Sequence, residues 1–189
     1  MAAQPAILYS VAEYLALEDA ATTKNEYYQG EIFAMAGASY AHNQITANTY
    51  LQIGKYLEDK TYSVFQSDLK IQVAANSLIT YPDITIVCEP VEIVNEKSGI
   101  IANPSVLIEV LSPSTQDYDR GGKFTLYRSL PSLQEYILIN SLAVHIEQFT
   151  KQPNGTWILQ EYKLPTDAVT IHTIDLTLTM DLIYKGVSF

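Results

Sequence analysis

The chain has 189 residues, of which 48% are hydrophobic, and its formal net charge is −10. This length and apolar share predict one domain with a sizeable core, and they exclude a chain that is disordered throughout. The negative charge excludes a surface broadly covered with cations for nucleic acid, because phosphate binding needs clustered Lys and Arg. It leaves room for a local basic groove and for acidic pockets that hold divalent metals.

The cysteine content and the N-terminal residues bear on the compartment. Cys88 is the one cysteine of the chain, so no disulfide can form within it. The N-terminus lacks the basic start and apolar stretch of a signal peptide, and no apolar run approaches the length of a membrane span. We therefore expect a cytoplasmic protein with no membrane partner. The 14 tyrosines suit a surface or an oligomer interface, and composition does not choose between these.

The N-terminal third predicts a helix, a hairpin and a second helix. Residues 10–13, S-V-A-E, form a capping-box pattern that begins a short helix. Residues 24–30 and 31–37 predict two short strands that meet at a glycine turn. A longer helix with a partly apolar face is expected over residues 39–58.

Strands dominate the rest of the chain, with one helix from about Asp117 to Ser129. The turn at residues 153–155, P-N-G, is a strong hairpin signal, and a short strand near Val169 precedes a helical or irregular tail. The strand-like runs are residues 62–67, 69–74, 83–89, 105–111, 135–140, 143–149 and 156–162.

The order of these elements predicts an α/β fold with a mixed central β-sheet flanked by helices. The buried-looking run 105–111, the helix after it and the run 135–140 are typical of a βαβ crossover between parallel strands. No internal repeat or linker interrupts the chain. We expect a single domain over residues 1–189, with the N-terminal helix and hairpin as an extension.

Two carboxylates occupy positions where a charge is costly. Asp83 opens one apolar run and Glu109 lies inside another. A buried carboxylate must be neutral, paired with a base or bound to a metal. Two carboxylates on neighbouring strands form the oxygen-rich pocket that Mg²⁺ or Mn²⁺ prefers. The alternatives are that Asp83 satisfies backbone amides and that Glu109 pairs with a structural base such as Arg120 or Arg128.

Lys123 follows the pair Gly121-Gly122 in the first turns of the predicted crossover helix. That helix must run back across the sheet, which brings Lys123 toward the strand that carries Glu109. An amine there can neutralise the carboxylates, orient an attacking water or offset charge on a transferring phosphoryl group. A lone lysine on a helix is more often solvated. Its coincidence with two acids in one βαβ unit predicts a site for phosphodiester hydrolysis.

Three stretches resemble the Uma-type family of the PD-(D/E)xK nuclease superfamily: YPDITIVCE, the run SVLIEVLSPSTQDYDRGGKFTLYRSLPSLQEYILI, and GEIFAMAG with the histidine after it. The resemblance covers about Glu26 to Ile139. It implies a restriction-endonuclease-like core, a divalent cation (Mg²⁺ or Mn²⁺) and an endonuclease that hydrolyses DNA. It matches the two acids of the family pattern to Asp83 and Glu109.

The sequence departs from that pattern at one position. The usual lysine lies two residues after the second acid, where this chain has Leu111. The resemblance implies that the lysine has moved to the following helix, at Lys123. The departure leaves a second reading open: a catalytically inactive nuclease-fold protein that acts as a binding or structural homodimer. A homodimer would also pool the few basic residues.

Two further residues match positions of the family. Glu31 would supply another oxygen near the metal, and His42 would have a catalytic or substrate-binding role. The alternatives are an exposed strand carboxylate and a histidine that caps or packs at the helix N-terminus. Asp68 and Lys70, on a neighbouring strand, are predicted to face solvent.

Overall fold

The computed structural model describes residues 7–189. The central sheet contains β3 (Tyr62–Gln66), β6 (Ile84–Cys88), β9 (Val106–Leu111), β10 (Glu135–Asn140), β11 (Ile146–Lys151) and β12 (Trp157–Tyr162). The second sheet contains β1 (Asn25–Tyr28), β2 (Glu31–Ala34), β4 (Lys70–Val73), β5 (Leu78–Thr80), β7 (Ile93–Asn95) and β8 (Ile100–Ile101). A C-terminal hairpin is formed by β13 (Ala168–Ile171) and β14 (Leu176–Thr179).

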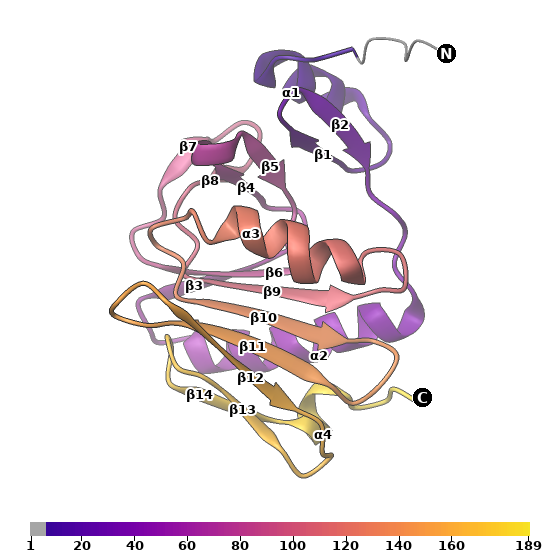
Figure 1. Ribbon diagram of the computed structural model, residues 1–189, viewed down its shortest axis with the longest axis vertical. Coiled ribbons are helices and arrows are strands. Elements are labelled where there is room, and N and C mark those ends of the chain that lie inside the picture. The colour runs from indigo at the N-terminus through magenta and orange to yellow at the C-terminus, as the bar shows by residue number, and fades with distance from the viewer. Residues whose placement is uncertain (1–6) are drawn as a thin grey trace.

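The helices lie mainly on the two faces of the central sheet. They are α1 (Val11–Ala20), α2 (Tyr40–Leu57), the 3-10 turn η1 (Ala74–Asn76), the π-helix η2 (Tyr118–Lys123), α3 (Phe124–Tyr127) and α4 (Met180–Ile183). Side chains of α2 pack in one core cluster of the sheet and those of α3 in another. Figure 1 shows α3 in front of the sheet, with α1 and the β1–β2 hairpin at the N-terminal end of the molecule.

The central sheet has the order β12-β11-β10-β9-β6-β3. Strands β9 and β10 are parallel, and their register runs from Val106 opposite Glu135 to Leu111 opposite Asn140. The other neighbours pair antiparallel. Since η2 and α3 connect β9 to β10, the βαβ crossover is present. The predicted α/β architecture, a mixed sheet flanked by helices, is confirmed.

Strand β9 is buried on both faces, which explains its nearly continuous apolar sequence. Ile108 belongs to the cluster that contains α2, whereas Leu107 and Leu111 belong to the cluster that contains α3. Side chains alternate along a strand. Glu109 therefore projects toward the α3 face, between two leucines.

The N-terminal helix and hairpin join the second sheet. Strand β1 pairs with β5, with Tyr27 opposite Ile79. Glu18 of α1 accepts hydrogen bonds from the backbone amide of Asn25 (3.0 Å) and from the hydroxyl of Tyr81 (2.6 Å). These contacts tie the segment to the strand that leads into the central sheet. They favour a single folding unit, and the single-domain organisation itself stays a prediction.

Two local expectations have opposite outcomes. Asp68 is exposed, as predicted. The prediction for Lys70 is wrong: it is 8% exposed, and its Nζ donates to the carbonyl oxygen of Ser98 at 2.9 Å. Its ammonium also lies 4.9 Å from the ring centroid of Tyr81, so the side chain is held against the protein rather than in solvent. Within residues 7–189, no helix combines the length and the hydropathy that spanning a bilayer requires.

Candidate active site

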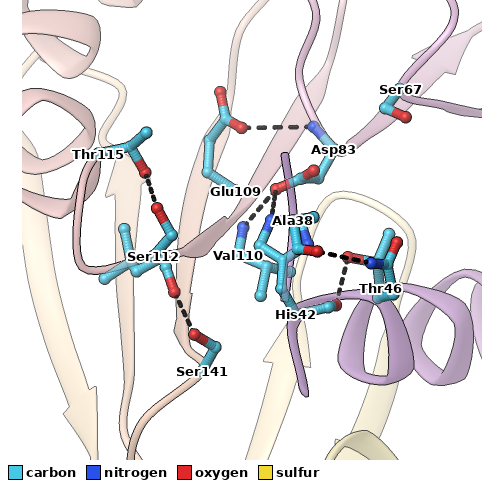
Figure 2. A network of polar contacts seen from close by, with 12 residues as sticks. Ala38, His42, Thr46, Ser67, Asp83, Glu109, Val110, Ser112, Thr115 and Ser141 are labelled. Atoms are coloured by element: carbon cyan, nitrogen blue, oxygen red, sulfur yellow. Dashed lines mark hydrogen bonds and ion pairs between the residues drawn. The ribbon is translucent and has the colours of Figure 1, made fainter. Parts of the chain in front are cut away.

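Asp83 and Glu109 lie side by side because β6 and β9 are antiparallel neighbours. Ile84, the first residue of β6, is opposite Ile108 of β9. The backbone amide of Asp83 donates to Glu109 Oε2 at 3.3 Å, and the amide of Val110 donates to Asp83 Oδ2 at 2.8 Å. Figure 2 shows both contacts. The structure thus brings these two acids together, and their role as metal ligands stays a prediction.

His42 reaches this pair from the first turn of α2. Its Nε2 lies 3.1 Å from Asp83 Oδ2 (Figure 2). Burial lowers the pKa of His42, but the hydrogen bond and charge of Asp83, with the charge of Asp119, raise that pKa above its ordinary value. Its Nδ1 is buried and has no hydrogen-bond partner within residues 7–189. The imidazole therefore fixes Asp83 Oδ2 together with the Val110 amide.

Lys123 points into the molecule, toward three carboxylates. Its Nζ lies 3.2 Å from Glu109 Oε1, 3.1 Å from Glu26 Oε1 and 3.4 Å from Asp119 Oδ1. Its side chain is 7% exposed. The hydroxyl of Tyr127 adds a hydrogen bond of 3.0 Å to Glu109 Oε1. We call these five residues the lysine cluster.

The electrostatics of the lysine cluster follow from its burial. Burial raises the pKa of Glu109 and of Asp119 above their ordinary values, although the charge of Lys123 lowers both. Burial lowers the pKa of Lys123, but the surrounding carboxylates raise it well above its ordinary value. The amine is therefore charged. One ammonium faces three carboxylates, and Asp83 adds a fourth beside Glu109, so the site carries an excess of acidic groups that favours a cation.

The local helix geometry places the lysine. The segment η2 is a π-helix, a rare form that often marks functional sites. Its neighbouring arginines have other partners: Arg120 Nε donates to Glu147 at 2.8 Å, and Arg128 contacts Thr125 at 3.4 Å. The alternative in which one of these arginines pairs with Glu109 is therefore wrong. The partner is Lys123.

Sequence reasoning missed three members of the lysine cluster. Asp119 and Tyr127 lie four residues before and four residues after Lys123, and this spacing on one helix face was an available signal. Glu26 comes from β1 and is 8% exposed. Glu31, the hairpin carboxylate singled out by the sequence, is exposed at the start of β2. No hydrogen bond or ion pair within residues 7–189 includes its side chain, so the structure does not bring it into the cluster.

The donor set at Asp83 and Glu109 fits a hard divalent cation. Carboxylate oxygens are the ligands that Mg²⁺ and Mn²⁺ prefer. No group of three or more His, Cys, Asp or Glu side chains in residues 7–189 is placed so that it could hold a metal ion. Mg²⁺ is usually held by one or two carboxylates together with waters and substrate phosphates rather than by an all-protein cage. Two adjacent acids would be the protein share of such a site.

The fold is that of a nuclease-like α/β protein. The chain belongs to the family described as "Uma2: Putative restriction endonuclease", which it matches over residues 11–181. The predicted family is therefore confirmed.

Two relatives and one solved structure are similar to the chain. "Uncharacterized protein slr1290" of Synechocystis sp. is 37% identical over 180 residues, 95% of this chain and 93% of that protein. "Uncharacterized protein sll1609" of the same organism is 36% identical over 154 residues, 82% and 87% of the two chains. A crystal structure of an Anabaena variabilis protein, described as a putative nuclease belonging to DUF820, has a TM-score of 0.69 at 19% identity. It covers 87% of this chain and 91% of that chain, and this likeness supports the fold.

Proposed function

We propose that this protein is a metal-dependent endonuclease that hydrolyses DNA phosphodiester bonds. The observation that carries the proposal is the meeting of Asp83, Glu109 and the Lys123 amine, which lies 3.2 Å from Glu109. Family membership and a nuclease-like fold support a nuclease-like activity. The metal, the substrate and the residue roles are our assignments.

Asp83 and Glu109 would hold the divalent ion, Mg²⁺ or Mn²⁺. Such an ion supplies Lewis acidity toward a phosphoryl oxygen and lowers the pKa of water. His42 and the Val110 amide hold Asp83 Oδ2 in a fixed orientation. Burial raises the pKa of Glu109 to about 8, and the charge of Lys123 lowers it. Lys123 also places a positive charge beside the acids, where negative charge would develop on the phosphoryl group.

The replacement of the usual lysine by Leu111 is compatible with this arrangement. Leu111 is 2% exposed and packs in the same core cluster as Phe124 of α3. It shares a face of β9 with Glu109, and that face is covered by η2 and α3. A lysine on the helix therefore reaches the carboxylate from the same side of the sheet as a lysine two residues after Glu109.

The experiment is a titration of Mg²⁺ and of Mn²⁺ into wild type and Glu109→Gln, followed by melting temperature and by nicking of supercoiled plasmid DNA. We expect metal to stabilise the wild type by about 2.7 kcal/mol at one hundred times its dissociation constant. The Gln variant should lose this stabilisation, and its nicking rate should fall at least ~10²–10³-fold, the cost of removing one transition-state-stabilising group.

Glu31→Gln is the matched control, because it removes a carboxylate that the structure leaves exposed outside the lysine cluster. It should nick and bind metal like wild type. Loss of activity in Glu31→Gln would show that Glu31 takes part in the active site. Equal behaviour of wild type and Glu109→Gln would contradict the nuclease proposal.

One observation favours a second candidate function. Lys123 is engaged by three carboxylates, as it would be in a purely structural ion cluster. The protein would then be a catalytically inactive nuclease-fold homodimer or binding protein. Sedimentation of the wild type, with DNA binding that persists without metal and without cleavage, distinguishes this candidate from the first.

A further inference from the structure

Tyr118, the first residue of η2, lies beside the lysine cluster and is partly exposed to solvent. Its ring centroid is 5.9 Å from Lys123 Nζ, yet the residue is 41% exposed. Burial raises the pKa of its phenol, the charge of Glu26 raises it further, and the charge of Lys123 lowers it. The distance to Lys123 places the ring within electrostatic reach of the buried charges, beside the candidate active site.

The backbone beneath the ring is shaped to receive it. A Cβ at Gly122 would lie 2.5 Å from Tyr118 Cδ2 and 2.6 Å from Cε2, closer than such atoms approach one another. At Gly121, a Cβ would meet no atom within 4 Å. Of the two adjacent glycines, Gly122 is therefore the one that lets the aromatic ring rest against the helix backbone. The contact with Gly122 therefore sets the orientation of the Tyr118 ring before any ligand binds.

The distribution of charge limits how this protein can hold DNA. The chain has 11 Lys and Arg against 21 Asp and Glu. Four basic residues outside the lysine cluster are taken up in ion pairs, Lys24–Asp68, Lys97–Asp19, Arg120–Glu147 and Lys163–Glu161. Binding along a duplex depends mainly on cations that neutralise phosphates. Stacking of a base on an aromatic ring does not require these cations.

We propose that Tyr118 stacks on an unpaired base of the substrate, and that the preferred substrate is single-stranded or locally unpaired DNA. In a duplex the faces of each base are covered by their neighbours, so a preset exposed ring has nothing to stack on until a base is displaced. This inference rests on the proposed function for its substrate class. It adds a specificity-determining residue that touches the base, while the lysine cluster acts on the phosphate.

The binding experiment uses wild-type protein in EDTA, so that no cleavage takes place. A single-stranded oligonucleotide that contains 2-aminopurine is titrated with wild type, Tyr118→Phe and Tyr118→Ala, and the fluorescence quench is followed. We expect Tyr118→Ala to weaken binding about 5- to 150-fold, which corresponds to ~1–3 kcal/mol per stacked base. Tyr118→Phe should bind like wild type, because it keeps the ring.

Phe189→Ala is the control, since Phe189 is an exposed aromatic residue that contacts Tyr184, in the core cluster of the opposite sheet face. It should not change binding. The same sequence as a duplex should bind more weakly and without dependence on Tyr118. With Mg²⁺, Tyr118→Ala should raise KM for single-stranded DNA more than it lowers kcat.

The failure of this inference differs from the failure of the proposed function. Binding that depends on Tyr118 without any cleavage would reject the nuclease and keep the stacking site. Cleavage with equal affinity in wild type and Tyr118→Ala would keep the nuclease and overturn the stacking site. A preference for duplex, or no DNA binding by wild type, would also overturn it.

Discussion

Among the buried glutamates of the central sheet, Glu109 and Glu135 lie on opposite faces, and their surroundings differ. Glu109 on β9 is 4% exposed, and Glu135 on the parallel neighbour β10 is 1% exposed. Glu135 accepts hydrogen bonds from the amide and hydroxyl of Thr173, both 2.6 Å, and from Gln148 Nε2. Both of its oxygens are satisfied by neutral donors that belong to the fold.

Glu109 is satisfied in another way. Its Oε1 contacts a charged amine and a tyrosine hydroxyl, and its Oε2 has a backbone contact of 3.3 Å that comes from Asp83, itself an acid. Neutral donors that occupy both oxygens of a carboxylate leave it little capacity to bind a further ligand. Glu109 shares one cation, Lys123, with two other acids. Acidic groups therefore outnumber the cation there, and the site can attract further positive charge. The type of partner, rather than burial, separates the candidate functional glutamate from the structural one.

The largest effect on stability is expected from Lys123→Met. This change leaves three buried carboxylates without their cation, and breaking a buried ion pair from one side costs about 3–5 kcal/mol. Urea unfolding at neutral pH measures it. The control is Lys163→Met, which breaks the exposed pair with Glu161 and should change stability little, because exposed ion pairs contribute little.

A second variant keeps this prediction testable if Lys123→Met does not fold. Adding Glu109→Gln to it removes one of the buried acidic groups left without their partner, so the double variant should be more stable than Lys123→Met alone. Equal stability of Lys123→Met and Lys163→Met would mean that the three acids are protonated in the wild type and that the cluster is not ionic.

Glu135→Gln should lower stability by about 1.5–3 kcal/mol, the contribution of hydrogen bonds to a charged group. The new amide nitrogen must face a donor, either at Thr173 or at Gln148, so at least one bond is lost and a donor–donor contact is formed. Plasmid nicking should be unchanged once the protein is folded. Glu109→Gln should instead lose nicking in the folded protein. A loss of nicking in both variants would remove the distinction between the two faces.

The sequence predicted the elements with long periodic patterns and missed the shortest strands. The crossover around β9 and β10 was found because two strands of six residues flank a helix. Strands β5, β7 and β8 have two or three residues, too few for a period to appear. The runs 62–67 and 69–74 look alike in sequence, yet β3 and β4 belong to different sheets. Only long-range pairing decides this.

The same limit applies to the candidate site. Asp83, Glu109 and Lys123 were found because a charge in an apolar run is conspicuous and because a crossover helix must return over its sheet. Glu26 was not found, since a glutamate in a short hairpin strand usually faces water. It is buried because β1 pairs with β5, from where the hydroxyl of Thr80 donates to Glu26. No residue near Glu26 in the sequence predicts that Thr80 is its partner.

The smallest effects come from removing one hydroxyl from each glutamate. Tyr127→Phe deletes the donor to Glu109 Oε1, and Thr173→Val deletes the hydroxyl donor to Glu135 Oε1 while its amide remains. Each should cost about 1 kcal/mol, the usual net contribution of one hydrogen bond. Urea unfolding compares them.

The two hydroxyl variants should differ in nicking at a fixed, subsaturating Mg²⁺ concentration. Tyr127→Phe removes a contact that favours ionised Glu109, so nicking should fall by less than about tenfold, the factor that corresponds to 1.4 kcal/mol. Thr173→Val should leave it unchanged, because Glu135 lies on the other face of the sheet. Equal stability losses with unequal nicking would show that the effect on nicking does not come from lost stability. An equal loss of nicking in both variants would show that the two carboxylates act through the sheet rather than through their own partners.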